Sequence, residues 1–319
     1  MDFTHLIDLA AARTGGRVLE ANDEFFAPKE NLLKAPKAIW LADKYTNKGK
    51  WMDGWETRRR RTPGFDWCVL KLGLRGVIRG VNIDTAFFTG NYPSHASIEA
   101  RDGSGPWTEI LPKSELKGGS DNLFAVAADK AWTHLRLNIF PDGGVARLRV
   151  YGDVTPNWKA VPKKALVDLA SVGYGGLPLL SSDQFYSHPQ NLIMPGRAKN
   201  MGDGWETKRR RGPGHDWLIL KLGAPGVLRK IEVDTNHFKG NYPDSCMIEG
   251  VHKTGVVSPD QLADEFTPWV PILPQTKLSA SKRHLFHKQI SAHGPITHVR
   301  LNIYPDGGVS RLRLWGVRA

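Results

Sequence analysis

Residues 201–217 hold the densest group of reactive side chains, in the order Met-Gly-Asp-Gly-Trp-Glu-Thr-Lys-Arg-Arg-Arg-Gly-Pro-Gly-His-Asp-Trp. Glu206 and Asp216 supply carboxylates, His215 supplies an imidazole, and four consecutive cations occupy 208–211. A carboxylate and a histidine can transfer protons near neutral pH, and guanidinium groups bind carboxylates through two parallel hydrogen bonds. The segment therefore predicts a loop that binds an anionic substrate and acts on it.

A second copy of this segment lies at residues 52–67, and the similarity extends far beyond it. Residues 6–152 align with 166–316 over nearly their whole length. Two long periods indicate tandem domains, whereas a solenoid would need more and shorter repeats. We name the two halves the first repeat and the second repeat.

The two repeats differ in length at two places. The first holds ten extra residues near 38–50, and the second has an inserted loop near 252–266. A proline-containing stretch between the repeats is typical of a linker. The predicted organisation is a first repeat at 1–153, a linker at 154–164 and a second repeat at 165–319.

The pattern within each repeat predicts strands. Residues 134–139 alternate between polar and apolar side chains, as do 298–303, and this period of two indicates a half-buried strand. The runs 67–70 and 217–220 are wholly apolar, as in a strand that is covered on both faces. Only the opening of each repeat, residues 6–12 in the first, has a pattern that would suit a short helix. We therefore predict an all-β chain with an antiparallel β-sandwich in each repeat.

The charge of the chain points to an anionic ligand. There are 44 Lys and Arg against 32 Asp and Glu, a formal net charge of +12. A basic surface can follow nucleic-acid phosphates or concentrate a small anion in a cleft. The arginine runs lie inside motifs that also contain Gly, Trp and Glu, whereas a free basic arm is low in complexity. We therefore expect a small anionic substrate and no nucleic-acid partner.

The chain shows no sign of membrane insertion or export. No apolar run approaches the roughly 18 residues of a membrane-spanning helix, so we expect no membrane partner. The opening Met-Asp-Phe-Thr-His lacks the basic and apolar regions of a signal peptide, which predicts a cytoplasmic location. Cys68 and Cys246 stand at non-equivalent positions, so neither a duplicated disulfide nor a metal knuckle is expected. Both are predicted to be small buried residues of strands.

The repeats also differ in side chains that could do chemistry. An active site that was lost and then packed for stability would exchange polar groups for apolar ones. This predicts an active site in the second repeat and a structural, degenerate site in the first. The alternative, that the two histidines only satisfy local backbone groups, stays open. The corresponding pairs, second repeat first, are His215 and Phe65, Asn236 and Ala86, and His237 and Phe87.

Residues that both repeats share have structural explanations as well. Trp55 and Trp205 flank apolar strands and are predicted to be core anchors. Glu56 and Glu206 could neutralise the adjacent arginines or act as bases beside them. No metal-binding spacing such as His-Glu-x-x-His or Cys-x-x-Cys occurs. A carboxylate and histidine site for a hard divalent ion stays open, so the metal requirement is not assigned.

Five motifs of the chain resemble the allantoicase family, purine-catabolic hydrolases made of two tandem repeats. The resemblance covers both repeats from end to end. It implies two galactose-binding-like jelly-roll sandwiches, a homo-oligomer, and the conversion of allantoate and water to ureidoglycolate and urea. The motifs are Met-Asp-Gly-Trp-Glu-Thr-Arg-Arg-Arg-Arg at 52–61, Gly-Asp-Gly-Trp-Glu-Thr-Lys-Arg-Arg-Arg at 202–211, Pro-Gly-His-Asp-Trp at 213–217, Asp-Thr-Asn-His-Phe-Lys-Gly-Asn at 234–241 and Leu-Asn-Ile-Tyr-Pro-Asp-Gly-Gly at 301–308.

The chemistry of allantoate suggests roles for individual residues. Its carboxylate calls for a guanidinium fork, and its two ureido groups call for amide or carboxylate partners. Expulsion of urea calls for an acid and a base. The predicted roles are carboxylate binding by Arg209 and Arg210, ureido binding by Asn236 and Asn241, base catalysis by Glu206 or Asp216, and proton donation by His215 or His237.

A non-catalytic tandem module that binds carbohydrates or anions is the alternative function. Galactose-binding-like sandwiches often bind ligands through their end loops without catalysis, and a fold does not decide function. Such a module usually serves an attached catalytic domain, and the two repeats leave no room for a third domain here. Histidines in one repeat only suit a single polar site better than two equivalent lectin sites. We therefore favour the hydrolase.

Overall fold

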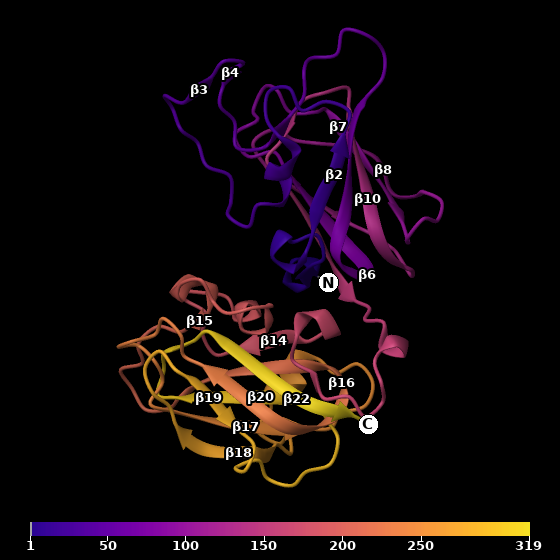
Figure 1. Ribbon diagram of the computed structural model, residues 1–319. Helices are drawn as coiled ribbons and strands as arrows, with labels where there is room; N and C mark the ends of the chain where they lie inside the picture. The colour runs from indigo at the N-terminus through magenta and orange to yellow at the C-terminus, as the bar shows by residue number, and fades with distance from the viewer. Residues whose placement is uncertain (1) are drawn as a thin grey trace. The chain divides into compact units, whose positions relative to one another are not determined.

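The computed structural model describes residues 2–319 and contains two compact units, one ending at Thr155 and one running from Pro156 to Ala319. Each unit is built almost entirely of antiparallel strands, which confirms the predicted fold class (Figure 1). The first repeat contains β1 (Ile7–Asp8), β2 (Arg17–Ala21), β3 (Tyr45–Thr46), β4 (Gly49–Lys50), β5 (Trp55–Glu56), β6 (Asp66–Asp84), β7 (His95–Arg101), β8 (Thr108–Glu115), β9 (Asp121–Ala125), β10 (Ala131–Phe140), β11 (Gly144–Val145) and β12 (Arg147–Val154). The second contains β13 (Val167–Asp168), β14 (Leu177–Ser181), β15 (Trp205–Glu206), β16 (Asp216–Asp234), β17 (Ser245–Val251), β18 (Val270–Lys277), β19 (Arg283–Phe286), β20 (Ile296–Tyr304), β21 (Gly308–Val309) and β22 (Arg311–Arg318).

Helices are few and short. The α-helix α1 (Pro259–Ala263) lies in the loop that is inserted into the second repeat. Residues 6–12 contain the strand β1 in place of the short helix that their pattern allowed. No helix among residues 2–319 is long and apolar enough to cross a membrane. Single turns of 3₁₀ helix occur at Phe3–His5, Ala12–Thr14, Lys29–Leu33, Trp158–Ala160, Val172–Tyr174, Pro189–Ile193 and Met201–Asp203.

One long strand joins the two layers of each sandwich. The first part of β6, residues 66–71, pairs with β2 and β10, and residues 76–84 pair with β12 and β9. Strands β7 and β8 extend the layer beyond β10, and β1 lies beside β12. In the second repeat β16 has the same role, with β14, β20, β22 and β19 as its partners.

Both ends of β6 return to the same end of the sandwich. Asp66 pairs with Ile139 and Asp84 pairs with Arg147, and these two partners flank the turn between β10 and β12. The loop before β6, the loop after it and this turn are therefore neighbours. Three segments that lie far apart in the sequence thus meet at one end of each repeat.

The core confirms the side chains that the alternation predicted to face inward. The apolar residues of β6, β10 and β12 form one buried cluster. Trp55 and Trp205 are fully buried, and their Nε1–H groups donate to the carbonyls of Asp23 and Asp183 at 2.8 and 2.9 Å. The two cysteines are buried and unpaired, as expected. The tryptophans therefore anchor the start of each polar loop to the core.

A buried ion pair ties the same loop to the sheet. Arg147, the first residue of β12, is 1% exposed and donates to Asp53 Oδ2 at 2.7 Å. Its other N–H groups donate to the carbonyls of Pro36 and Asp53 at 2.9 and 2.8 Å. Burial alone would raise the pKa of Asp53, but the hydrogen bonds from Arg147 and Ile39 lower it overall. The corresponding pair in the second repeat joins Arg311 to Asp203.

Arg147→Met should lower the free energy of unfolding by about 3–5 kcal/mol, because the Asp53 carboxylate then stays buried without its main partner. The matched control is Arg79→Met, which removes an exposed ion pair to Asp153 at 2.7 Å and should cost less than about 1 kcal/mol. Urea denaturation followed by tryptophan fluorescence compares the two variants. Equal losses would show that burial of the Arg147 pair has no special importance.

Candidate functional site

Each repeat has a cleft where the three loops meet. The cleft of the first repeat has a volume of ≈ 370 Å³ and that of the second ≈ 590 Å³; we call them the first cleft and the second cleft. Corresponding residues line both, with Phe26 in place of Tyr186 and Ser94 in place of Asp244. The polar side chains of the second cleft come from Tyr186, Glu206, Thr207, Arg209, Arg210, Asn241, Tyr242, Asp244 and Asp306.

A carboxylate and an amide meet in each cleft. Asn241 Nδ2 donates to Glu206 Oε1 at 2.5 Å, and Asn91 Nδ2 donates to Glu56 Oε1 at 2.6 Å. Burial raises the pKa of Glu56, and the hydrogen bond from Asn91 opposes that shift. The glutamates are positioned by backbone pairing, since Glu206 faces Gly308 across β15 and β21. Each cleft therefore offers a fixed carboxylate whose amide partner keeps its own carbonyl oxygen for a ligand.

Nearby carboxylates pair with some of the four consecutive cations at 208–211 and leave others without an ion pair in the described chain. Arg210 Nη2 donates to Asp216 Oδ1 at 2.7 Å, and its backbone N–H donates to Asp306 Oδ2 at 2.8 Å. Arg209 lines the cleft and forms no ion pair within residues 2–319. Both arginines line the cleft, but a buried aspartate neutralises Arg210, so the structure distinguishes two adjacent arginines that the sequence could not.

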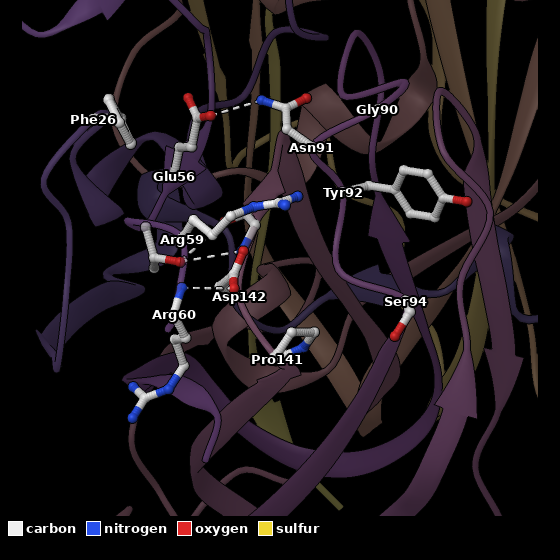
Figure 2. Close-up of a pocket in the computed structure, with 12 residues that line it drawn as sticks. Phe26, Glu56, Arg59, Arg60, Gly90, Asn91, Tyr92, Ser94, Pro141 and Asp142 are labelled. Carbon is white, nitrogen blue, oxygen red and sulfur yellow. Dashed lines mark hydrogen bonds between the residues drawn. The ribbon is translucent and has the colours of Figure 1, made fainter. Parts of the chain in front are cut away.

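In the first cleft the two corresponding arginines, Arg59 and Arg60, also differ from each other (Figure 2). Arg59 is turned toward Asn91 and Tyr92, and the Arg60 side chain is turned the other way. Arg60 Nη1 donates to Asp66 Oδ1 at 2.7 Å. In the first cleft, Arg59 is therefore the guanidinium that is directed toward Asn91, and Arg60 is paired with Asp66.

Asp216 and His215, both predicted as catalytic, lie beside the second cleft and do not line it. Asp216 is 1% exposed and accepts hydrogen bonds from Arg210 and Ser182. The His215 ring packs on Tyr304 with its centroid 4.6 Å away. Each of these two residues therefore has a local structural task in the described part of the chain.

The other two residues that distinguish the repeats also reach local partners. His237 Nε2 lies 2.9 Å from the carbonyl oxygen of Ala198, and Asn236 Nδ2 donates to the same oxygen at 3.4 Å. Neither residue lines the second cleft. His237 and its counterpart Phe87 both adopt a left-handed backbone, with φ of 72° and 69°. The loops therefore keep one backbone shape while their side chains differ.

Some cleft residues carried a weaker signal in the sequence. Asp306 belongs to a Pro-Asp-Gly-Gly motif that occurs in both repeats. From the sequence alone this motif predicts only a turn. Its carboxylate receives the Arg210 backbone N–H, and the neighbouring Gly307 N–H donates to Thr207 Oγ1 at 3.1 Å. Among residues 2–319, no group of three or more His, Cys, Asp or Glu is arranged to hold a metal ion. Recurrence of the motif was the signal that could have placed this turn at the site.

Comparison with known proteins finds relatives that match almost the whole chain. The allantoicase repeat family matches residues 7–155 and again 167–319. A probable allantoicase 1 of Burkholderia mallei is 50% identical, over 97% of this chain and 94% of the relative. An allantoicase of Dictyostelium discoideum is 50% identical, over 96% and 86% of the two chains. A crystal structure of Saccharomyces cerevisiae allantoicase superposes with a TM-score of 0.82 at 38% identity, over 97% and 92%.

His215→Phe should lower the free energy of unfolding by about 1 kcal/mol, because the side chain of Asn302 loses a hydrogen-bond partner. His215 Nε2 lies 3.1 Å from Asn302 Oδ1, whereas the equivalent Asn138 Oδ1 has no partner among the described residues. The reciprocal variant Phe65→His supplies that partner and should not destabilise the chain. Thermal unfolding of both variants tests this, and an unchanged midpoint for His215→Phe would contradict it.

Proposed function

This chain belongs to the allantoicase family, and on that premise we propose that it converts allantoate and water to ureidoglycolate and urea in the second cleft. The observation that supports this site is the meeting of Arg209, Glu206 and Asn241 in one cavity. An unpaired guanidinium, a carboxylate and an amide are the groups that a carboxylate with two ureido arms requires.

Arg209 binds the carboxylate of allantoate in this proposal. Its guanidinium can donate two parallel hydrogen bonds to a carboxylate, and no residue of the described chain neutralises it first. Arg210, the other predicted carboxylate ligand, is held by Asp216 at 2.7 Å. We therefore assign Arg210 and Asp216 to positioning, since their ion pair fixes the segment from which Arg209 projects.

The ureido groups are bound by the paired carboxylate and amide. Glu206 has a second carboxylate oxygen that can accept a ureido N–H. Asn241 uses its Nδ2 on Glu206, which leaves its Oδ1 to accept a second ureido N–H. These contacts orient one arm of the substrate, with the central carbon between Arg209 and Glu206.

The reaction takes one proton from water and delivers one proton to the leaving nitrogen. The water oxygen bonds to the central carbon while the bond from that carbon to a ureido nitrogen breaks, and the electron pair leaves on nitrogen. Glu206 accepts the proton of the water and returns it to the departing nitrogen, so one carboxyl balances both transfers. His215 and His237, predicted as proton donors, are assigned to positioning because they lie outside the cleft.

We further propose a homo-oligomeric enzyme with a cytoplasmic location. The family relationship supports both statements, and neither depends on the assignment of the cleft residues. Sedimentation of the purified protein and fractionation of its native cells are the measurements that decide them.

Glu206→Gln should lower kcat for urea release from allantoate by about 10²–10⁴-fold, because the amide cannot take a proton from water. KM should rise as well, since glutamine offers one carbonyl oxygen where Glu206 offers one oxygen to Asn241 and another to a ureido N–H. Glu56→Gln is the matched variant in the first cleft, and His215→Phe tests the histidine. Both should keep turnover near that of the wild type if the second cleft does the chemistry.

Two results would contradict that assignment. Full turnover by Glu206→Gln with an unchanged KM would remove the proposed base. A loss in Glu56→Gln as large as that in Glu206→Gln would give the first cleft an equal part in catalysis. An absence of urea release by the wild type would favour the binding-module alternative.

Arg209→Gln should lower kcat/KM by about 10- to 100-fold, mainly through KM, because it removes a charge-assisted hydrogen bond to the substrate carboxylate. Arg211→Gln is the control. Arg211 follows Arg210 in the sequence and does not line the cleft, so its replacement should have little effect. Steady-state kinetics of the two variants provide the comparison. A larger effect at Arg211 would show that Arg211, and not Arg209, binds the substrate carboxylate.

A further inference from the structure

The first repeat has a hairpin that the second repeat lacks. Strands β3 and β4 pair through Tyr45 with Lys50 and Thr46 with Gly49, and they extend away from the first sandwich (Figure 1). They lie within the stretch near 38–50 where the first repeat is ten residues longer. This hairpin is a separate addition to the loop that carries Glu56.

The hairpin is held in place by contacts of its own. Lys50 Nζ donates to the carbonyl of Leu41 at 2.9 Å and to that of Ala42, and it lies 4.7 Å from the Trp40 ring centroid. Trp40 also stacks on Phe87, with the two ring centroids 6.0 Å apart and an angle of 28° between the ring planes. Phe87, which replaces His237, thus joins the hairpin to the loop after β6. The ammonium group of Lys50 is therefore bound within the hairpin, by two backbone carbonyls and the Trp40 ring.

A pocket of ≈ 290 Å³ lies between the hairpin and the first cleft; we call it the hairpin pocket. Phe26, Glu56 and Asn91 line both spaces. The pair of Glu56 and Asn91, joined at 2.6 Å, therefore stands between two compartments. Glu206 and Asn241 of the second repeat have no hairpin beside them.

Each compartment is lined by a cation without a carboxylate partner among residues 2–319, and the hairpin pocket has two, Lys48 and Lys50. Arg59 is directed into the first cleft (Figure 2), and Lys48 lines the hairpin pocket. Lys48 Nζ lies 4.7 Å from the Phe25 ring centroid and has no carboxylate partner in the described part of the chain. Two positive groups thus flank one carboxylate and one amide.

We propose that the first repeat binds a dianion whose two carboxylates flank a ureido group, with one carboxylate on Arg59, the other on Lys48, and the ureido N–H groups on Glu56 and Asn91 Oδ1. The second cleft has one such cation and takes a ligand with one carboxylate. The duplicated site therefore has two ligand classes, and the hairpin decides between them.

The environment of Glu56 is consistent with a donor-rich ligand. Burial raises the pKa of Glu56, and Asn91 is the one hydrogen-bond donor that opposes the shift. A ureido group would bring further N–H donors to this carboxylate and stabilise its charged form. The site does not depend on catalysis in the second cleft.

Calorimetric titration of the full chain with two matched probes tests the proposal. N,N′-carbonylbis(glycine) carries one carboxymethyl group on each ureido nitrogen, so that its two carboxylates flank the ureido group, and N-carbamoyl-glycine carries only one. We expect the wild type to bind the first probe more tightly, and Lys48→Gln to reduce that affinity by about fivefold, which is the effect of one exposed ion pair. The affinity for N-carbamoyl-glycine should stay the same in Lys48→Gln.

Two further variants serve as controls. Lys44→Gln removes a lysine of the same loop that lies over Trp51 at 4.0 Å and does not line the pocket, so it should bind both probes like the wild type. Glu206→Gln should also leave the affinity for N,N′-carbonylbis(glycine) unchanged. Equal affinity of the wild type for both probes would overturn the proposal, as would no effect of Lys48→Gln. A loss in Glu206→Gln would place the dianion in the second cleft and overturn it as well.

Urea release from allantoate, measured with the same proteins, separates this proposal from the proposed function. Lys48→Gln and Lys44→Gln should keep the turnover of the wild type. Probe binding that depends on Lys48 in a chain without turnover would support the dianion site and contradict the enzymatic assignment. Turnover without selective probe binding would do the reverse.

Discussion

A guanidinium–carboxylate pair, fully buried in the first repeat and partly exposed at Asp203 in the second, holds each ligand loop to its sandwich. Removal of two charges from water is costly, and the pair persists because backbone carbonyls take the remaining N–H groups of the arginine. Arg147 begins β12 and Asp53 lies three residues before Glu56, so the pair transfers the rigidity of the sheet to the cleft. Trp55, which directly precedes Glu56 in the sequence, is fully buried and adds apolar anchoring. The position of every cleft side chain on this loop depends on that connection.

Selective neutralisation organises the segment that follows. Four adjacent cations would repel one another if all faced the same space. Asp216 in the second repeat and Asp66 in the first each neutralise one arginine, and Arg209 and Arg59 remain for the ligand. The buried aspartates thus control the site without touching its contents. The basic run serves binding and loop structure at once.

The fold was predictable because alternation and repetition are local properties of a sequence. Strand positions, the buried tryptophans and the tandem arrangement follow from such patterns. The roles of Arg209 and Arg210 were not separable, because their directions depend on a carboxylate that arrives through the start of β16. His215 and His237 looked catalytic by residue type, but Tyr304 and Ala198 are their partners in space. The hairpin pocket depends on how an insertion folds back on Glu56, which no local pattern encodes.

The single unpaired guanidinium in the second cleft has a consequence for the order of events after bond cleavage. Allantoate and ureidoglycolate both carry the carboxylate that Arg209 is proposed to hold, whereas urea is neutral. The charged fragment therefore stays bound by the same contact that captured the substrate, and urea leaves first. Ureidoglycolate would act as a competitive product inhibitor whose strength declines as salt screens the guanidinium. The carboxylate that the substrate and ureidoglycolate share would then set the order of product release.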